Sequence, residues 1–337
     1  MPNWRKISFG WKLLFIKRKT KSLTKKAQYE PRKITLQYRN DYLVKKTKKA
    51  LKIFRINLTV KGYENVGNGP AIIIANHQDN VDAVLLLYAL KKQTEAHDDL
   101  NKIPTFLAKH TLQYNKITNN ILSSINTFFL NRNDIKKSLE TYQDFGKFVK
   151  ENKTFGVIFA EGTRNTEGDI APFKPGSFKV AKKELLPIIP VTINNSVQGS
   201  NLDRKEHLDV EIIFHKKIPA SSLITQNTVA ISERVYNIVK SAFKKPELPS
   251  LAKEKENEAE IENSKGALKW KKQEAKKEMK KHKKQQRELR QEQRLIEAEK
   301  KEDEKYEKYQ SKINKKKSAN YLEEDTKETN ERGTDEL

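Results

Sequence analysis

Short apolar runs alternate with helical patterns along the middle of this chain, and several of the runs end on polar residues. Ala71-Ile72-Ile73-Ile74-Ala75 has the composition of a strand buried on both faces. Similar runs occupy residues 103–109, 127–132, 155–160 and 188–193, while residues 57–62 alternate like a half-buried strand. Strands that alternate with helices predict an α/β fold, with a central, mostly parallel sheet flanked by helices.

The segment Asn76-His77-Gln78-Asp79-Asn80-Val81-Asp82 joins the first of these buried strands to a helical pattern. On a regular helix a five-residue step separates two side chains by about 140°. His77 and Asp82 therefore meet only if His77 lies in the turn and Asp82 in the first helical turn. An aspartate on one imidazole nitrogen leaves the other to accept a proton. When this segment is taken alone, a capped turn with a surface histidine is the favoured interpretation.

Composition excludes several classes of site and segment. The 337 residues include no cysteine, which excludes disulfides, thiol nucleophiles and metal–thiolate sites. No run of about eighteen apolar residues occurs, so we expect no transmembrane helix. Lys12 and Lys17-Arg18-Lys19 interrupt the only early apolar stretch, which argues against a secretory signal.

The basic charge is concentrated at the N-terminus, where residues 1–55 hold 18 Lys/Arg and 2 Asp/Glu. Tryptophan, phenylalanine and leucine among the lysines of residues 1–20 are typical of a segment in a membrane interface. Residues 40–56 continue as an amphipathic helix. We therefore predict a basic amphipathic membrane-interface segment over residues 1–55; a disordered basic tail and an RNA-binding arm are the alternatives.

The C-terminal segment differs in composition from the rest of the chain. Residues 249–337 contain few apolar residues, and residues 251–337 contain 25 Lys/Arg and 22 Asp/Glu. Such a composition predicts a charged low-complexity tail, helical or disordered, with a coiled coil or partner-binding role as the lesser alternative. The globular domain is then expected over residues 56–248.

The polar segments resemble the sequence blocks of the glycerolipid acyltransferases, the 1-acylglycerol-3-phosphate acyltransferases in particular. Over about residues 50–240 the blocks occur in the family's order with familiar spacing. They are H-x4-D from His77 to Asp82, Phe129-Leu130-Asn131-Arg132, Glu161-Gly162-Thr163-Arg164 with the following Phe173-Lys174-Pro175-Gly176, and Ile188-Ile189-Pro190-Val191.

The resemblance implies transfer of a fatty acyl group from a thioester to the sn-2 hydroxyl of 1-acylglycerol 3-phosphate, forming phosphatidic acid in phospholipid biosynthesis. It makes His77 the base and Asp82 the group that orients its ring. Substrate binding then falls to residues suited to a phosphate and a glycerol: Arg132, Glu161, Gly162, Thr163, Arg164 and Lys109. A structural or acyl-site role falls to Asn76, Phe129 and Pro190, and for Pro190 a structural turn is equally plausible.

Attack by the substrate hydroxyl without an acyl-enzyme is the simpler mechanism, because the chain has no cysteine and the blocks have no serine. We expect no cofactor and no metal ion. Backbone N–H groups near the His77 turn are candidate donors to the oxyanion.

Two positions depart from the family pattern. Asp79 stands where a serine is frequent, and we expect its carboxylate to face away from the His77 ring. Asn126 stands where the second block often begins with glycine, and asparagine tolerates the left-handed backbone that such a turn requires.

The implied partners are acyl-CoA or acyl-carrier protein as donor, lysophosphatidic acid as acceptor and an anionic membrane surface, with no nucleic acid. A peripheral or monotopic protein at the cytoplasmic face of the cell membrane is expected. Another lysophospholipid or glycerophosphate acceptor is the main alternative. A basic nucleic-acid-binding protein would leave the four blocks unexplained.

Overall fold

The computed structural model describes residues 4–93, 100–132, 134–165 and 168–246, together with Ala275, Met279 and Gln286. The chain divides into two compact units, Met1–Ala267 and Leu268–Leu337, and the fold below is that of the first. Apart from the three isolated positions, the tail predicted over residues 249–337 lies outside the described residues.

A seven-stranded sheet forms the centre of the first unit, in the order β1-β7-β6-β2-β5-β3-β4. All neighbouring strands pair in parallel except β6 and β7, so the predicted mostly parallel α/β sheet is confirmed. The strands are β1 (Ile56–Lys61), β2 (Ala71–Ala75), β3 (Pro104–Lys109), β4 (Phe128–Leu130), β5 (Phe155–Phe159), β6 (Ile188–Asn194) and β7 (Leu208–Phe214).

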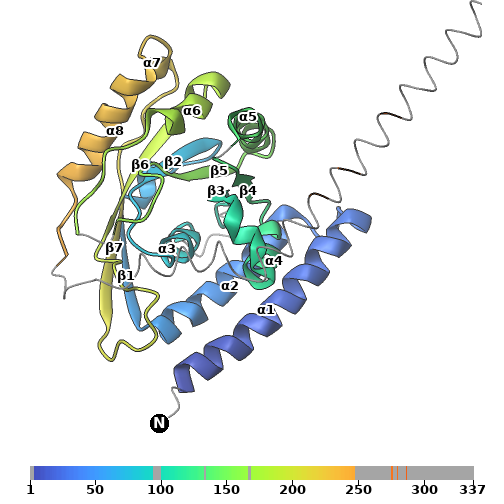
Figure 1. Cartoon of the computed structure of the whole chain (residues 1–337). Helices are drawn as coiled ribbons and strands as arrows, with labels where there is room; N and C mark the ends of the chain where they lie inside the picture. Colours follow the sequence, from blue (N-terminus) through green and yellow to red (C-terminus); the bar gives the residue numbers. More distant parts are fainter. Residues whose placement is uncertain are drawn as a thin grey trace, which may run out of the picture. The chain divides into compact units, whose positions relative to one another are not determined.

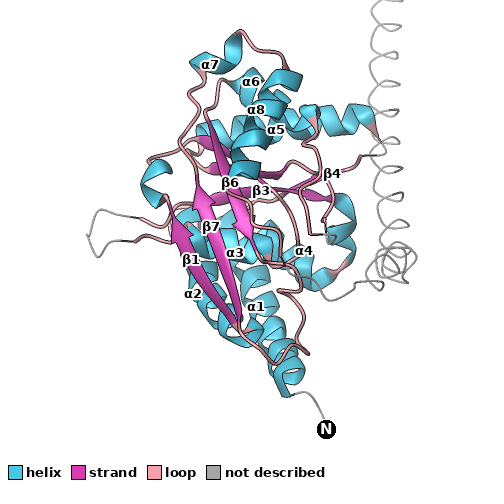
Figure 2. Cartoon of the chain, turned by 90° about the vertical axis from the view of Figure 1, so that its left-hand side faces the viewer, coloured by secondary structure: helices cyan, strands magenta, loops and turns pink. Residues whose placement is uncertain are grey.

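Helices cover both faces of this sheet (Figures 1 and 2). One face carries α2 (Leu36–Phe54), α3 (Asp82–Ala89) and α4 (Lys116–Ser123), with α1 (Trp4–Tyr29) beside α2 and α4. The other carries α5 (Ile135–Glu151), α6 (Lys179–Glu184) and α8 (Thr228–Ser241), with α7 (Ser221–Ile224) near α6. Short 3-10 turns are η1 (Tyr63–Asn65), η2 (His110–Tyr114) and η3 (Pro175–Phe178).

Strand β2 divides the two apolar cores. Its five residues are all buried. Ile73 packs in the core under α2 and α3, whereas Ile72 and Ile74 pack in the core with Phe145 of α5. Because successive strand residues point to opposite faces, a strand buried on both faces reads as an uninterrupted apolar run.

Helix α1 is apolar on two opposite sides. Its inner side packs on α2, where Phe9 meets Phe54 edge-on with 5.0 Å between ring centroids. Its outer side exposes large apolar groups at positions within about 100° of the helix circumference: Trp4, Ile7, Trp11, Leu14 and Phe15. Among the described residues, no helix is both long and apolar enough to cross a membrane.

The expected helix at residues 40–56 is confirmed as α2, which begins earlier, at Leu36. The Thr35 side chain caps it by accepting from the Tyr38 N–H, and Arg55 ends it in a left-handed conformation. The basic segment therefore forms two helices, α1 and α2, which pack against each other.

The carboxyl ends of the central strands lie along one edge of the sheet. Ala75 of β2 pairs with Phe159 of β5, and Lys109 of β3 pairs with Leu130 of β4. The loops that follow these four strands therefore meet at one place, where open α/β sheets build their sites.

Candidate active site

The His77 and Asp82 side chains meet at this edge. His77 lies in the turn after β2 and Asp82 is the first residue of α3, with 2.7 Å between Nδ1 and Oδ2. Asp82 Oδ2 also accepts from the N–H groups of Gln78 at 2.8 Å and Asp79 at 3.0 Å. The carboxylate is fully buried and closes the turn while it holds the ring.

The plane of the His77 ring is set by Phe159 at the end of β5. The two rings stack with 4.1 Å between centroids and 17° between planes. The His77 carbonyl accepts from the Asn165 N–H at 2.8 Å. Since Nδ1 faces Asp82, Nε2 is the nitrogen left for a substrate.

Glu161 lies behind the His77 turn. Its side chain accepts from the His77 N–H at 2.7 Å and the Ala171 N–H at 2.9 Å, and the residue is 3% exposed. Burial raises the pKa of this carboxyl to about 7, with a smaller contribution from Asp82. The resemblance implied substrate contact for Glu161, but this residue is not on the cleft wall; it joins the loop after β5 to the His77 turn.

The Asp79 carboxylate is bonded away from the His77 ring, as expected. Oδ1 accepts from the N–H groups of Val81 at 2.8 Å and Ser200 at 3.1 Å, and Oδ2 accepts from Ser200 Oγ at 3.0 Å. Burial raises the pKa of Asp79. The residue therefore ties the turn to the loop that follows β6.

Gln78 and Asn76 make similar ties to β6 and its loop. Gln78 Oε1 accepts from the Ser196 N–H and hydroxyl, both at 3.1 Å. The Asn76 amide exchanges two hydrogen bonds with the Ile193 backbone, at 2.9 and 2.7 Å. Asn76 thus has a structural position beneath the site.

Four backbone N–H groups of the turn are already occupied. Those of His77, Gln78, Asp79 and Val81 donate to Glu161, Asp82 or Asp79. In this arrangement none of the four is available to an oxyanion, which corrects the expectation for these amides.

A cleft of about 260 Å³ opens beside His77. The structure brings to its wall Lys109 at the end of β3, Arg132 after β4, and Gly162, Thr163 and Arg164 after β5. Arg132 Nη1 donates to the Gly162 carbonyl and so joins two of these loops. The apolar part of the wall includes Ala83, Phe106, Leu112 and Leu122.

The turn that precedes β4 has the left-handed residue that the sequence predicted. Asn126 has a φ of 54°, so asparagine supplies the left-handed residue. Phe129 is half-buried within β4 and does not line the cleft.

Pro190 is buried inside β6, paired with Ile74 of β2, so the interpretation as a structural turn is wrong. The β6–β7 ladder begins one residue later, at Val191, so that strand pair requires no N–H from Pro190. The Pro190 carbonyl accepts from the His215 N–H at 3.0 Å. Pro190 is not among the residues that line the cleft.

Asn80 and Phe159 line the cleft although the sequence did not single them out. Phe159 ends a predicted strand, but only the pairing of β5 with β2 places it against His77. Within the described parts of the chain, no group of three or more His, Asp or Glu side chains is placed to hold a metal ion. Arginine and lysine beside an imidazole instead suit an anionic substrate.

Comparisons with known proteins show which sequences this chain resembles. Residues 57–194 match the family model described as Acyltransferase. A probable 1-acyl-sn-glycerol-3-phosphate acyltransferase of Mycoplasma genitalium is 29% identical over 58% of this chain and 72% of its own length. The 1-acyl-sn-glycerol-3-phosphate acyltransferase of Saccharomyces cerevisiae is 30% identical over 42% of this chain and 44% of its own.

A crystal structure of the 1-acyl-sn-glycerophosphate (LPA) acyltransferase from Thermotoga maritima is 20% identical. The structural match covers 70% of this chain and 95% of the Thermotoga maritima chain, with a TM-score of 0.49.

Proposed function

We propose that this member of the acyltransferase family acylates the sn-2 hydroxyl of 1-acylglycerol 3-phosphate to give phosphatidic acid. The match to the family model over residues 57–194 supports the assignment. The enzyme class follows from the family, and relatives from bacteria and yeast carry the name of this activity. One observation supports this acceptor. His77, which is held by Asp82, lines the same cleft as the basic residues Lys109, Arg132 and Arg164.

The His77–Asp82 geometry suits a single displacement. Nε2 of His77 removes the proton of the acceptor hydroxyl as its oxygen attacks the thioester carbonyl. Asp82 holds the ring through Nδ1 and stabilises the imidazolium that forms. When the carbon–sulfur bond breaks, the thiolate leaves and takes the proton from Nε2, so the base is regenerated.

The basic groups of the cleft suit the acceptor phosphate. In 1-acylglycerol 3-phosphate, only two carbons and one ester oxygen separate the sn-2 oxygen from phosphorus, so both must lie in the same cleft. Arg132 and Arg164 line that cleft with His77, and guanidinium groups bind phosphate oxygens in pairs. Glu161 then positions the His77 turn through the His77 N–H rather than binding the acceptor.

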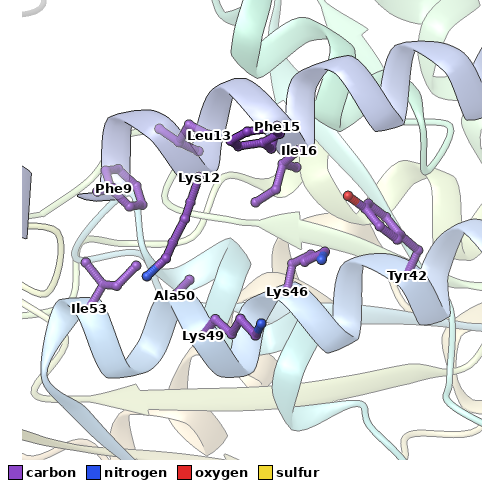
Figure 3. A pocket seen from close by; sticks show the side chains of 10 residues that line it. All are labelled: Phe9, Lys12, Leu13, Phe15, Ile16, Tyr42, Lys46, Lys49, Ala50 and Ile53. Atoms are coloured by element: carbon purple, nitrogen blue, oxygen red, sulfur yellow. The ribbon is translucent and has the colours of Figure 1, made fainter. Parts of the chain in front are cut away.

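The outer side of α1 supports attachment to an anionic membrane surface, which we propose is the cytoplasmic face of the cell membrane. The exposed groups at Trp4, Trp11 and Phe15 are of the type found at membrane interfaces, and lysines flank them along the helix. Figure 3 shows the inner side, where Ile16 of α1 points toward α2 into a cavity of about 140 Å³; Phe15, at the border of the outer side, also lines this cavity. The inner side packs α1 on the domain, which leaves the outer side for lipid.

An acyl-transfer assay tests the function. The wild-type chain, lysophosphatidate and either acyl-CoA or acyl-carrier protein should yield phosphatidic acid, and His77→Ala should lower kcat by about a thousandfold or more. A thermal melt should show that the variant remains folded. Lysophosphatidylcholine and glycerol 3-phosphate serve as competing acceptors, and a higher kcat/KM for either would replace the proposed acceptor.

A further inference from the structure

We propose that a second cavity, separated from the His77 cleft by Arg132 and Phe159, binds the phosphopantetheine arm of the acyl donor. This rests on the proposed function, because it assigns the donor side of the same reaction. Phosphopantetheine is the chemistry that coenzyme A and acyl-carrier protein share.

The second cavity has a volume of about 290 Å³ and lies between the sheet, α5 and η3. Its wall includes Leu130 and Ile158 from the strands, Tyr142 from α5, and Ser177 from η3. Arg132, Phe159 and Gly162 line both this cavity and the His77 cleft. A ligand that lies across this shared wall can therefore reach from one to the other.

Besides Arg132 on the shared wall, two lysines stand around this otherwise largely apolar space and do not line the His77 cleft: Lys174 and Lys179. In the described part of the chain, no ion pair joins Lys174 or Lys179 to a carboxylate. Positive groups gathered at a cavity favour an anionic ligand. Amine and guanidinium groups are the usual partners of phosphate oxygens.

The position of Lys174 depends on Gly162. A Cβ atom at Gly162 would lie 2.9 Å from Lys174 Nζ and 3.0 Å from its Cδ and Cε, so the lysine side chain crosses the face of the glycine. The Lys174 N–H also donates to the Ala160 carbonyl at 2.9 Å. The loop after β5 therefore holds this lysine against the wall that both cavities share.

The length of the ligand distinguishes the donor from the acceptor. The acceptor phosphate stays close to the reacting hydroxyl and so belongs in the His77 cleft. In the donor, the pantetheine arm places its phosphate far from the thioester carbonyl, which suits a second set of cations beyond the first cleft. The arm alternates amides with methylene and methyl groups, and the hydroxyls of Ser138, Ser177 and Tyr142 stand among leucine and isoleucine side chains.

The test replaces both lysines with methionine, which preserves most of the side-chain length and removes the charge. For Lys174→Met with Lys179→Met we expect the KM for the donor to rise about tenfold, as for a lost charged hydrogen bond. The KM for lysophosphatidate should stay within about twofold. The matched control is Lys183→Met, an exposed lysine on the same helix as Lys179 and outside the cavity.

Two donors identify the source of the phosphate. A rise in KM with acyl-CoA and with acyl-carrier protein alike supports recognition of the shared arm. A rise with one donor only would assign the cations to that carrier's own charges and overturn the proposal. A rise in the KM for lysophosphatidate instead would assign the cavity to the acceptor.

A binding measurement separates this proposal from the proposed function, because it needs no turnover. Calorimetry should show that the wild-type chain binds 4′-phosphopantetheine about tenfold more tightly than pantetheine, and that the double lysine variant loses this preference. Equal binding of the two compounds by the wild type would overturn the donor site. If the wild-type chain showed this preference for 4′-phosphopantetheine but no acyl transfer, the proposed reaction would be overturned and the proposed binding site would stand.

Discussion

The His77 turn buries polar side chains, whereas helix α1 exposes apolar ones, so both depart from the usual pattern of burial. In the turn, Asn76, Gln78, Asp79 and Asp82 are polar and buried. On α1, Trp4, Trp11 and Phe15 are aromatic and between 62% and 74% exposed. Both departures are costly for a folded chain unless a partner compensates them.

The two regions differ in where the compensating partner lies. Each buried polar side chain of the turn has at least one hydrogen bond within the protein, mostly to the loops after β2 and β6. The exposed aromatic groups of α1 share one side of a helix whose opposite side is already packed. The turn thus finds most of its partners within the protein, although Gln78 Nε2 and Asp82 Oδ1 are buried without one among the described residues. The outer side of α1 is instead suited to a partner from outside.

Asp82→Asn tests the His77 turn and should have the largest effect on activity. The amide can donate to Nδ1 and so favour the tautomer that carries its proton on Nε2, where it cannot act as a base. We expect kcat to fall by about a thousandfold. Steady-state kinetics with lysophosphatidate measures this.

Asp79→Asn is the matched control, because Asp79 is a buried carboxylate of the same turn that faces Ser200. Its kcat should fall by no more than about tenfold, with a lower melting temperature. Similar losses of kcat in both variants would mean that the turn acts only as a structural unit.

Serine at Trp4 and Trp11 tests the outer side of α1. These side chains are 74% and 62% exposed and do not line the cavity between α1 and α2, so the fold should survive their loss. A large apolar side chain contributes about 1.5–3 kcal/mol when fully buried, and an interface buries only part of it. We expect the double variant to bind anionic vesicles about 10–100-fold more weakly in flotation assays.

Serine at Ile224 and Val229 is the control, since these apolar residues are similarly exposed on α7 and the start of α8. Vesicle binding should then match the wild type. High salt should weaken binding further in every variant, because the lysines act through screened charge. Equal loss in the control would make vesicle binding a general property of exposed apolar groups.

Glu161→Gln sharpens the picture of the turn through the pH dependence of stability, with no large loss of activity expected. In the unfolded chain this carboxyl releases its proton near the ordinary glutamate pKa of 4.5, whereas the buried group keeps it until about pH 7. Raising the pH through this window therefore destabilises the folded wild type relative to the variant. The difference in unfolding free energy should shift by roughly 3 kcal/mol between pH 4.5 and 7.5, measured by urea denaturation.

Glu211→Gln gives a contrast of opposite sign. A hydrogen bond from Lys61 is the largest cause that lowers the pKa of Glu211 to about 2. Its contribution to stability is complete above the unfolded pKa and is lost only as the pH falls below it. The Glu211→Gln difference from wild type should therefore stay constant where the Glu161→Gln difference changes.

Features that are local in the sequence could be predicted from it. The His77–Asp82 contact required only a turn followed by a helix start, and the left-handed Asn126 required only its own backbone preference. Features set by pairing between distant segments could not. Glu161 reaches the His77 N–H because β5 lies beside β2, and periodicity in one strand does not name its neighbour.

The two-sided character of α1 shows the same limit. Its apolar residues are evident in the sequence, but packing against α2 decides which of them are covered. Strand β7 was not predicted either. It is the strand that runs antiparallel to β6, and its pairing with β1 near the start of the domain joins segments about 150 residues apart.

Gly162 has a consequence for how this sequence can change. Its carbonyl holds Arg132, its bare Cα face carries the Lys174 side chain, and its φ of 80° is strained for any residue with a Cβ. Every substitution there alters the backbone and at least one cation together. In a saturation mutagenesis library selected for growth on this activity, position 162 should therefore accept glycine alone, although it contributes no side-chain chemistry.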